Sequence, residues 1–128
     1  MRILLDTHIL LWALIEPGRL GASVTADLER PDNAVLFSSA SIWELAIKAG
    51  LGRLEVRVRP DEIAAAAIET GFMELPVQSR AAGLVASLPH HHRDPFDRLL
   101  IAQAMTEPAM FFTADRALPI YSELVRLV

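Results

Sequence analysis

The sequence of 128 residues contains no cysteine. This absence excludes a disulfide framework, a thiolate metal site and a cysteine nucleophile. Long apolar runs are also lacking, because polar residues interrupt the two runs nearest the start, Ile3–Leu5 and Ile9–Ile15. A bilayer span needs about 20 apolar residues, and a secretory signal needs an unbroken apolar stretch where Asp6 stands. The sequence therefore predicts neither a membrane span nor a signal peptide, and we expect the protein in the cytoplasm.

Basic charge is scarce: 12 lysines and arginines stand against 16 acidic residues, which gives a net charge of -4. This balance counts against a broad basic surface for nucleic acid. If a few of the acids surround metal ions, however, the remaining surface is close to neutral and local arginines can still contact phosphates. Apolar residues make up 52% of the chain, and no linker-like tract divides it. We therefore expect one globular domain over residues 1–128.

Short apolar segments alternate with segments of helical periodicity, which is typical of an α/β fold. The expected strands are Arg2–Leu5, Ala34–Phe37, Phe72–Leu75 and Met110–Thr113. The expected helices are Thr7–Ile15, Ala22–Glu29, Ile42–Ala49, Pro60–Glu69, Ser79–Leu88, Pro95–Thr106 and Ala117–Glu123. Such alternation predicts a mostly parallel sheet of four or five strands, joined by right-handed crossovers and covered by helices on both faces.

Four acidic residues are expected at one edge of this sheet. Asp6 directly follows the first strand, Glu44 lies early in the helix after the second, and Asp115 closely follows the last. The carboxyl ends of parallel strands form the functional edge in such sheets. Asp97 begins the helix that leads into the last strand, and a crossover helix runs antiparallel to the strands. Its start therefore returns to the same edge, beside Asp115.

Several carboxylates at one place favour a hard cation, because without one each is driven toward protonation. Oxygen ligands and the absence of cysteine favour Mg²⁺, with Mn²⁺ as a substitute. Such a metal polarises a phosphodiester and lowers the pKa of an attacking water. The sequence therefore predicts metal-dependent phosphodiester hydrolysis.

Several of these acids also have a structural explanation. Asp6 is a suitable N-cap, and Ser41 with Glu44 fits a capping box. Glu44 is equally placed to pair with Lys48 one turn later. Asp94 before Pro95 is best explained as the N-cap of its helix. A helix N-terminus also stabilises an ionised carboxylate, so a cap and a metal ligand are compatible roles.

Other residues give weaker indications. Arg93, Arg98 and Arg116 neighbour the acids and are candidate phosphate contacts, although arginines beside carboxylates are often simply paired with them. The three consecutive histidines of residues 90–92 are not expected to bind one metal ion together, because consecutive loop residues point in different directions.

Aromatic and basic residues elsewhere are open to two interpretations. Trp12 and Trp43 are core or interface aromatics. Between residues 53 and 59, three arginines alternate with leucine and valine. This pattern favours an exposed ribbon with one basic face, which is a weak indication of RNA contact.

Together these segments resemble the PIN-domain ribonucleases, specifically the VapC-like toxins of toxin–antitoxin pairs. The resemblance covers nearly the whole chain and depends on the order and spacing of four segments. They are residues 4–8 (LLDTH), 41–48 (SIWELAIK), 92–104 (HRDPFDRLLIAQA) and 113–115 (TAD).

The resemblance implies a PIN-like three-layer sandwich and a Mg²⁺-dependent endoribonuclease. Its catalytic acids correspond here to Asp6, Glu44, Asp97 and Asp115, with Asp6 and Asp97 as direct metal ligands. Thr7, Asp94 and Thr113 would support the site. The resemblance further implies a homodimer and a VapB-like antitoxin as partner, besides the RNA substrate.

Three alternatives stay open from the sequence. An RNA-processing nuclease without an antitoxin has the same acids. A phosphatase with Asp6 as nucleophile normally carries a second aspartate two residues later, where this chain has His8. A noncatalytic module with an acidic pocket assigns no joint role to Glu44 and Asp97.

Overall fold

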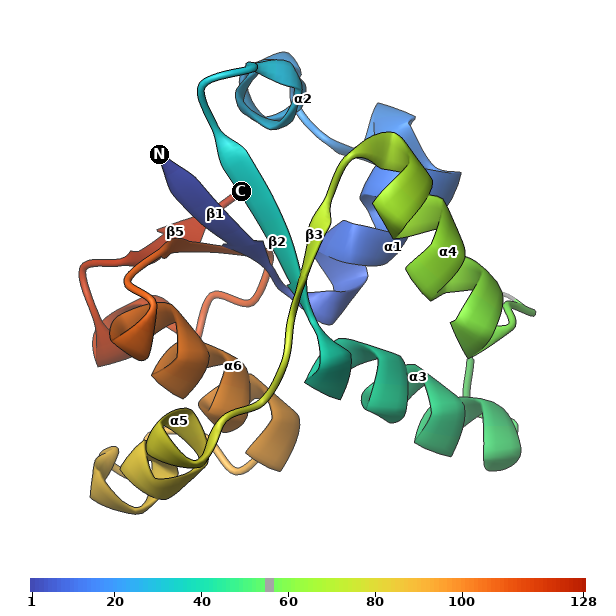
Figure 1. Cartoon of the computed structure of the whole chain (residues 1–128). Coiled ribbons are helices and arrows are strands. Elements are labelled where there is room, and N and C mark those ends of the chain that lie inside the picture. Colours follow the sequence, from blue (N-terminus) through green and yellow to red (C-terminus); the bar gives the residue numbers. More distant parts are fainter. Residues whose placement is uncertain (55–56) are drawn as a thin grey trace.

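A parallel β-sheet forms the centre of the computed structural model, which describes residues 1–54 and 57–128 (Figure 1). Within these residues the sheet has five strands in the order β3-β2-β1-β4-β5, and all neighbouring strands are parallel. The strands are β1 (Arg2–Leu5), β2 (Ala34–Ser38), β3 (Met73–Leu75), β4 (Met110–Thr113) and β5 (Val125–Leu127). The predicted α/β fold with a mostly parallel sheet is confirmed.

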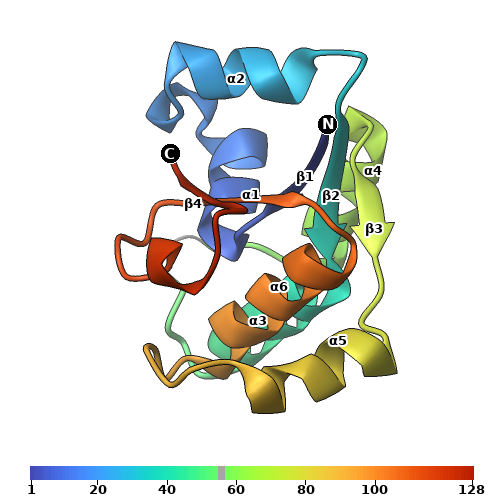
Figure 2. The same ribbon diagram turned by 90° about the vertical axis from the view of Figure 1, so that its left-hand side faces the viewer.

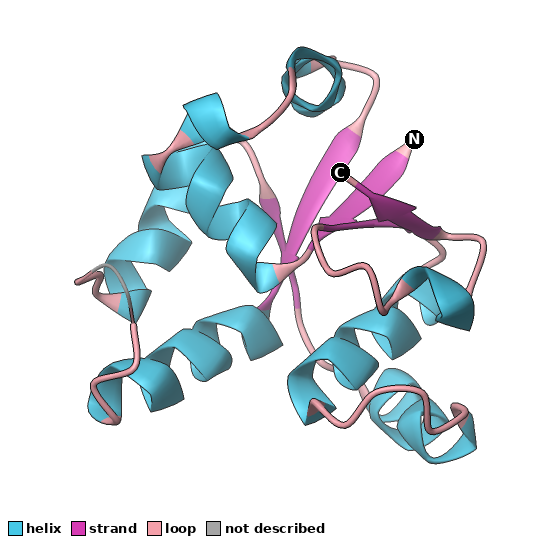
Figure 3. Cartoon of the chain, turned by 180° about the vertical axis from the view of Figure 1, so that it is seen from behind, coloured by secondary structure: helices cyan, strands magenta, loops and turns pink. Residues whose placement is uncertain are grey.

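Helices connect the strands and cover both faces of the sheet (Figures 2 and 3). They are α1 (Thr7–Ile15), α2 (Ala22–Glu29), α3 (Ser39–Gly50), α4 (Pro60–Thr70), α5 (Ser79–Leu84) and α6 (Pro95–Thr106). Short 3-10 turns follow as η1 (Pro17–Arg19), η2 (Val85–Ser87) and η3 (Pro119–Tyr121). None of the helices in the described ranges has the length and hydropathy needed to cross a membrane.

Alternating side chains of each strand enter two separate cores. Ile3 and Leu5 of β1 pack with Ile9 of α1 on one face, in a core that α2, α3 and α4 complete. Leu4 points to the other face, where it packs with Leu100 of α6. Because successive side chains of a strand point to opposite faces, a strand buried on both faces needs an unbroken apolar sequence, and β1 has one.

The start of α3 differs from the prediction. The helix begins at Ser39 instead of Ile42, because Ser38 at the end of β2 accepts a hydrogen bond from the Ala40 backbone N–H and caps it. Ser41 therefore lies within the first turn and is fully buried. The capping-box explanation of Glu44 is wrong, whereas the predicted ion pair between Glu44 and Lys48 is present.

The last segment of the chain is also different. The predicted helix Ala117–Glu123 is wrong: only the turn η3 forms, and Ser122 is already extended with φ −166°. The chain then continues into β5, which pairs with β4 and places Val125 opposite Phe111. The open edge of β4 offers backbone hydrogen bonds that a helix of seven residues cannot match, since so short a helix is marginal.

Two smaller corrections concern α5 and the segment before α4. The predicted helix Ser79–Leu88 ends at Leu84 and continues as the turn η2. The expected basic ribbon includes residues 55–56, which lie outside the described residues. On either side of them, the arginines at 53, 57 and 59 are exposed, while Leu54 and Val58 pack against the core.

Candidate active site

The carboxyl ends of β1, β2 and β4 meet at one edge of the sheet. Leu5, the last residue of β1, lies opposite Phe37 of β2 and Phe112 of β4. The residues that follow these positions are Asp6, Ser38 and Thr113, so they lie side by side. The backbone N–H of Asp6 donates to the Phe112 carbonyl at 2.9 Å, which extends the β1–β4 pairing by one step.

Asp6 is held firmly at this edge. Its Oδ1 accepts a hydrogen bond from the Thr7 backbone N–H at 2.7 Å, as expected for an N-cap, and its Oδ2 accepts one from Thr113 Oγ1 at 2.6 Å. The residue is buried. Two bonds from two different elements fix the carboxylate, so Asp6 caps α1 and its side chain is held in one orientation.

Glu44 is joined to the same edge through Thr7. The Thr7 hydroxyl lies 2.7 Å from Glu44 Oε1 and 2.9 Å from Ser41 Oγ. A hydroxyl has one hydrogen and an ionised carboxylate only accepts, so Thr7 donates to Glu44 and accepts from Ser41. Lys48 Nζ donates to Glu44 Oε2 at 2.5 Å. Both oxygens of this buried carboxylate are therefore satisfied.

The other acids come from the start of α6 and the end of β4. Asp94 caps α6, because its Oδ1 accepts from the backbone N–H groups of Phe96 and Asp97 at 2.8 and 3.2 Å. Asp97 Oδ2 lies 2.9 Å from His92 Nε2, which is 3.8 Å from Asp115 Oδ2. His92 therefore stands between Asp97 and Asp115.

One open pocket of about 440 Å³ collects these side chains. Its lining residues are Asp6, His8, Trp12, Glu44, Lys48, His92, Asp94, Asp97, Ala114 and Asp115. The topological argument thus placed all four acids correctly at one rim. Thr7 and Thr113 lie directly behind them, as hydrogen-bond donors to Glu44 and Asp6.

Crowding of negative charge changes the acidity of two of these groups. Burial raises the pKa of Asp6 above its usual range, although the hydrogen bonds from Thr113 and Thr7 work against this. Burial, and then the neighbouring carboxylates of Asp6 and Asp94, raises the pKa of Asp97 to about 7. The ionised form of Asp97 therefore needs a compensating positive charge.

Lys48 supplies part of that charge. Burial alone would lower the pKa of its ammonium. The hydrogen bond to Glu44 and the negative charges of Glu44, Asp94 and Asp97 outweigh burial, so the pKa is raised. Lys48 is therefore protonated at neutral pH and faces the acidic pocket. One ammonium does not balance five carboxylates, so the charges of Asp6 and Asp94 add to the effect of burial in raising the pKa of Asp97.

The donor set fits a hard divalent cation. Carboxylate oxygens dominate the pocket, and ligand atoms of His92, Asp94 and Asp97 lie within 4.8 Å of one another. Oxygen-rich sites of this kind suit Mg²⁺ or Mn²⁺, which keep several water ligands. A cation at this place would also remove the repulsion that raises the pKa of Asp97.

The sequence matches the PIN domain family over residues 3–124, nearly the whole chain. The chain belongs to the PIN domain family. This confirms the family that the sequence motifs indicated. No curated protein matches the chain.

Among solved structures, this PIN domain is similar to VapBC2 from Rickettsia felis bound to a DNA fragment from their promoter. The TM-score is 0.69 at 17% sequence identity, and the alignment covers 98% of this chain and 96% of that chain. At this identity the likeness shows the fold alone. It agrees with the three-layer sandwich described above.

Two residues of this PIN domain site were missed by sequence reasoning. Lys48 was predicted only as an ion-pair partner of Glu44, yet it also faces Asp94 and Asp97 across the pocket. His92 was set aside with its tract, because three consecutive histidines do not bind one ion together. His92 alone turns toward the acids. Its position two residues before the cap Asp94, nearer than His90 and His91, was the signal that distinguished it.

Arg98 requires a correction. The sequence placed it among the phosphate contacts, but its guanidinium is buried and donates to the carbonyl oxygens of Val85, Leu88 and Pro89 and to the Tyr121 hydroxyl. All of these partners lie away from the pocket, so Arg98 holds the loop before α6 in place. Arg93 and Arg116 are both exposed, and for these two a phosphate contact stays a prediction.

Proposed function

We propose that this PIN domain is a Mg²⁺-dependent or Mn²⁺-dependent endoribonuclease that hydrolyses phosphodiester bonds of RNA. The observation that carries this proposal is the pocket in which Asp6, Glu44, Asp97 and Asp115 meet at the carboxyl edge of the sheet. Family membership supports the proposal independently. A phosphatase using Asp6 as nucleophile fits less well, because such enzymes carry a second aspartate two residues later, where this chain has His8.

Asp6 and Asp97 would hold the metal, with Glu44 and Asp115 completing the acidic pocket. A bound divalent cation polarises the phosphodiester and lowers the pKa of the attacking water. The residues around it supply position: the hydrogen bonds from Thr7 and Thr113 keep Asp6 in one orientation. Lys48 donates a hydrogen bond to Glu44 and adds a positive charge beside the incoming phosphate.

Cleavage of a labelled single-stranded RNA tests the proposal. We expect cleavage with Mg²⁺ or Mn²⁺ and none with EDTA. Asp6→Asn and Asp97→Asn should lower the rate by roughly a hundredfold or more, because each removes a carboxylate that would hold the metal ion stabilising the transition state. Asp32→Asn is the matched control, since Asp32 is exposed before β2, at the opposite edge of the sheet. Circular dichroism would verify that each variant is folded.

Two outcomes would contradict the nuclease proposal. One is cleavage that EDTA does not affect, because it would remove the metal from the reaction. The other is a folded Asp97→Asn variant that cleaves as fast as the Asp32→Asn control.

We further propose that the nuclease is the toxin of a toxin–antitoxin pair, with a VapB-like antitoxin as its cytoplasmic partner. The sequence motifs support this, and the similar Rickettsia felis structure is of a VapBC2 pair. We expect a small gene for a DNA-binding protein directly upstream. Its product should copurify with this chain and suppress RNA cleavage. Without such a neighbour, an RNA-processing nuclease becomes the better explanation.

A homodimer is the proposed assembly. Trp43 and Ile47 of α3 and its C-cap Leu51 follow one another at intervals of four residues. Trp43 and Leu51 each keep 60% of their surface exposed. Side chains at this spacing form one stripe on a helix. Light scattering of the purified protein would give its mass in solution, for which we expect twice that of one chain.

A further inference from the structure

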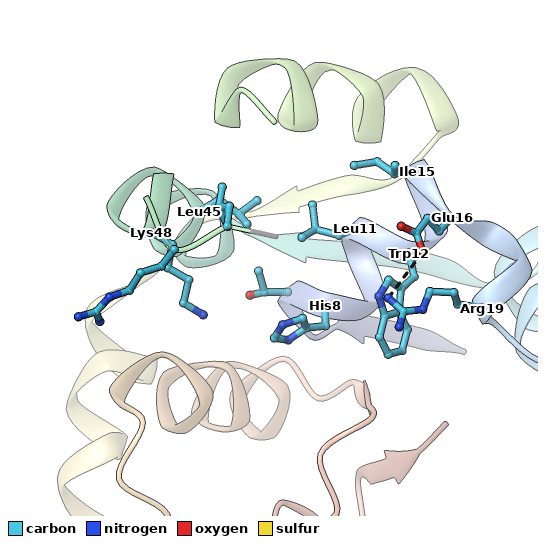
Figure 4. A pocket seen from close by; sticks show the side chains of 11 residues that line it. His8, Leu11, Trp12, Ile15, Glu16, Arg19, Leu45 and Lys48 are labelled. Carbon is cyan, nitrogen blue, oxygen red and sulfur yellow. Dashed lines mark ion pairs between the residues drawn. The ribbon is translucent and has the colours of Figure 1, made fainter. Parts of the chain in front are cut away.

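A second cavity opens directly beside the acidic pocket. It has a volume of about 330 Å³ and lies between α1, α3 and the segment that follows α3 (Figure 4). His8, Trp12 and Lys48 line both this groove and the acidic pocket. The two cavities are therefore neighbours that share part of their walls.

The groove has a different chemistry from the pocket. Its walls are largely apolar and include Leu11 and Trp12 of α1 and Leu45 of α3 (Figure 4). Three cationic side chains, Arg19, Lys48 and Arg53, stand among them. Glu16 is the one acid of the lining in the described residues, and it is paired with Arg19 at 3.6 Å.

Planar groups gather at one side of the groove, although the His8 and Trp12 rings are tilted by 51° to each other. The guanidinium carbon of Arg19 lies 4.7 Å from the centre of the Trp12 ring, and the ring of His8 lies 6.4 Å from it. The ion pair with Glu16 supports the Arg19 guanidinium in this position. Aromatic rings and arginine planes of this kind are the surfaces on which unpaired bases stack.

Apolar walls, planar groups and cations together suit a nucleotide of a single strand. Its base has two flat faces that prefer to leave water, and its phosphates require positive charge. The volume of the groove is at the lower end of the range of about 300–1,000 Å³ for small-molecule pockets. Such a space accepts one nucleobase with its sugar but not a duplex.

We infer that this groove binds the base of a nucleotide next to the scissile phosphate of a single-stranded RNA. The inference rests on the proposed nuclease function, since it places the phosphate in the acidic pocket. An apolar protein segment is the other occupant such walls accept. The cations Arg19, Lys48 and Arg53 and the adjoining acidic pocket, where we propose phosphodiester cleavage, favour the RNA strand.

Binding measured without cleavage tests the groove separately from the chemistry. The chain has two tryptophans, so Trp43→Phe leaves Trp12 in the groove as the only fluorescent one. The Trp43→Phe protein is titrated in EDTA with a short single-stranded RNA. It is also titrated with a series of the same RNA, in which each member carries one abasic nucleotide at a different position. We expect the intact RNA to change the Trp12 fluorescence.

One abasic position should weaken binding by about 5-fold to 100-fold, which is the range for the loss of one stacked base. Binding to the Trp12→Ala variant is measured with a filter-binding assay. This variant should bind the same abasic RNA as tightly as it binds the intact RNA. Arg53→Glu should weaken binding of every RNA more than the control Arg30→Glu. Both arginines are exposed, so neither change is expected to disturb folding.

The outcomes separate this inference from the nuclease proposal. A protein that cleaves RNA but binds all abasic strands as tightly as the intact strand overturns the groove inference and leaves the nuclease proposal standing. Selective loss at one abasic position without any metal-dependent cleavage supports the groove and overturns the nuclease. Equal weakening by Arg53→Glu and Arg30→Glu overturns the inference, because nonspecific attraction would then explain binding. An Arg53→Glu variant that binds RNA normally and is altered only in self-association or in antitoxin binding also overturns the inference.

Discussion

The carboxyl group of Asp97 stands beside those of Asp6 and Asp94 and is largely withdrawn from water, with 15% of the side chain exposed. Burial and the two neighbouring charges raise its pKa to about 7. In the unfolded chain the group returns to an ordinary pKa near 3.8. Between these two values the folded state binds more protons than the unfolded state, so the free energy of unfolding falls as the pH rises.

Asp97→Asn should therefore stabilise the metal-free protein at high pH. The neutral amide avoids the repulsion, and we expect a gain of about 1–3 kcal/mol at pH 8 that shrinks toward pH 5, where wild-type Asp97 is protonated. Urea unfolding in EDTA at both pH values measures this. The control Asp32→Asn should change the stability by less than about 0.5 kcal/mol. Equal stability of wild type and Asp97→Asn at pH 8 would show that no such repulsion exists.

At the scale of elements, the start of α6 serves the fold and the site together. Asp94 caps the helix through two backbone N–H groups, one of which belongs to Asp97. Pro95 occupies the first position of the helix, where its missing N–H costs nothing. The same cap that begins the helix thus fixes the backbone that carries a predicted metal ligand.

Two substitutions of Asp94 separate its roles. Asp94→Ala removes the cap and should cost about 0.5–2 kcal/mol of stability, with a fall in RNA cleavage because Asp97 loses its fixed position. Asp94→Asn keeps a capping oxygen and should retain most of both. Thermal unfolding and the RNA assay on the same samples measure the two effects. An Asp94→Asn variant that is fully stable but as inactive as Asp97→Asn would instead make Asp94 a metal ligand.

Sequence reasoning succeeded for elements with local signals. The limits of α1 and α2 were predicted to the residue, because α1 follows a capping aspartate and Pro17 and Gly18 end it. The start of α3 was predicted too late, since three serines stood within reach of the cap position. The strand β5 was missed, because three residues at a sheet edge carry no pattern of their own and form only beside β4.

The residues of the site also fall into those that local signals predicted and those that only the folded structure brings together. Asp6 and Asp115 follow strands and Asp97 opens a returning helix, so topology alone brought them together. Glu44 depended on the family resemblance, and the structure joins it to the others through the Thr7 hydroxyl, a contact 37 residues apart in sequence that no local pattern encodes. The burial of Arg98 likewise depends on a loop that folds over it, which the sequence does not reveal.

At the scale of the whole molecule, the residues that line the acidic pocket come from helices α1, α3 and α6 and from the ends of strands β1 and β4. A cation bound there contacts elements that come from both halves of the chain and from both faces of the sheet. Because the unfolded chain scatters these carboxylates, the ion binds the folded state preferentially. Metal binding should therefore stabilise the entire domain and not one helix alone.

Mg²⁺ or Mn²⁺ should accordingly raise the melting temperature of the wild-type protein. At a concentration one hundred times the dissociation constant, the gain is about 2.7 kcal/mol, which corresponds to roughly 10 °C for a domain of this size. The gain should be larger at pH 8 than at pH 5, because protons on Asp97 compete with the ion. Differential scanning fluorimetry with added metal, and with EDTA as reference, measures it. The control Asp32→Asn should keep the whole rise in melting temperature, and Asp97→Asn should lose most of it. An undiminished rise in Asp97→Asn would place the stabilising ion elsewhere on the molecule.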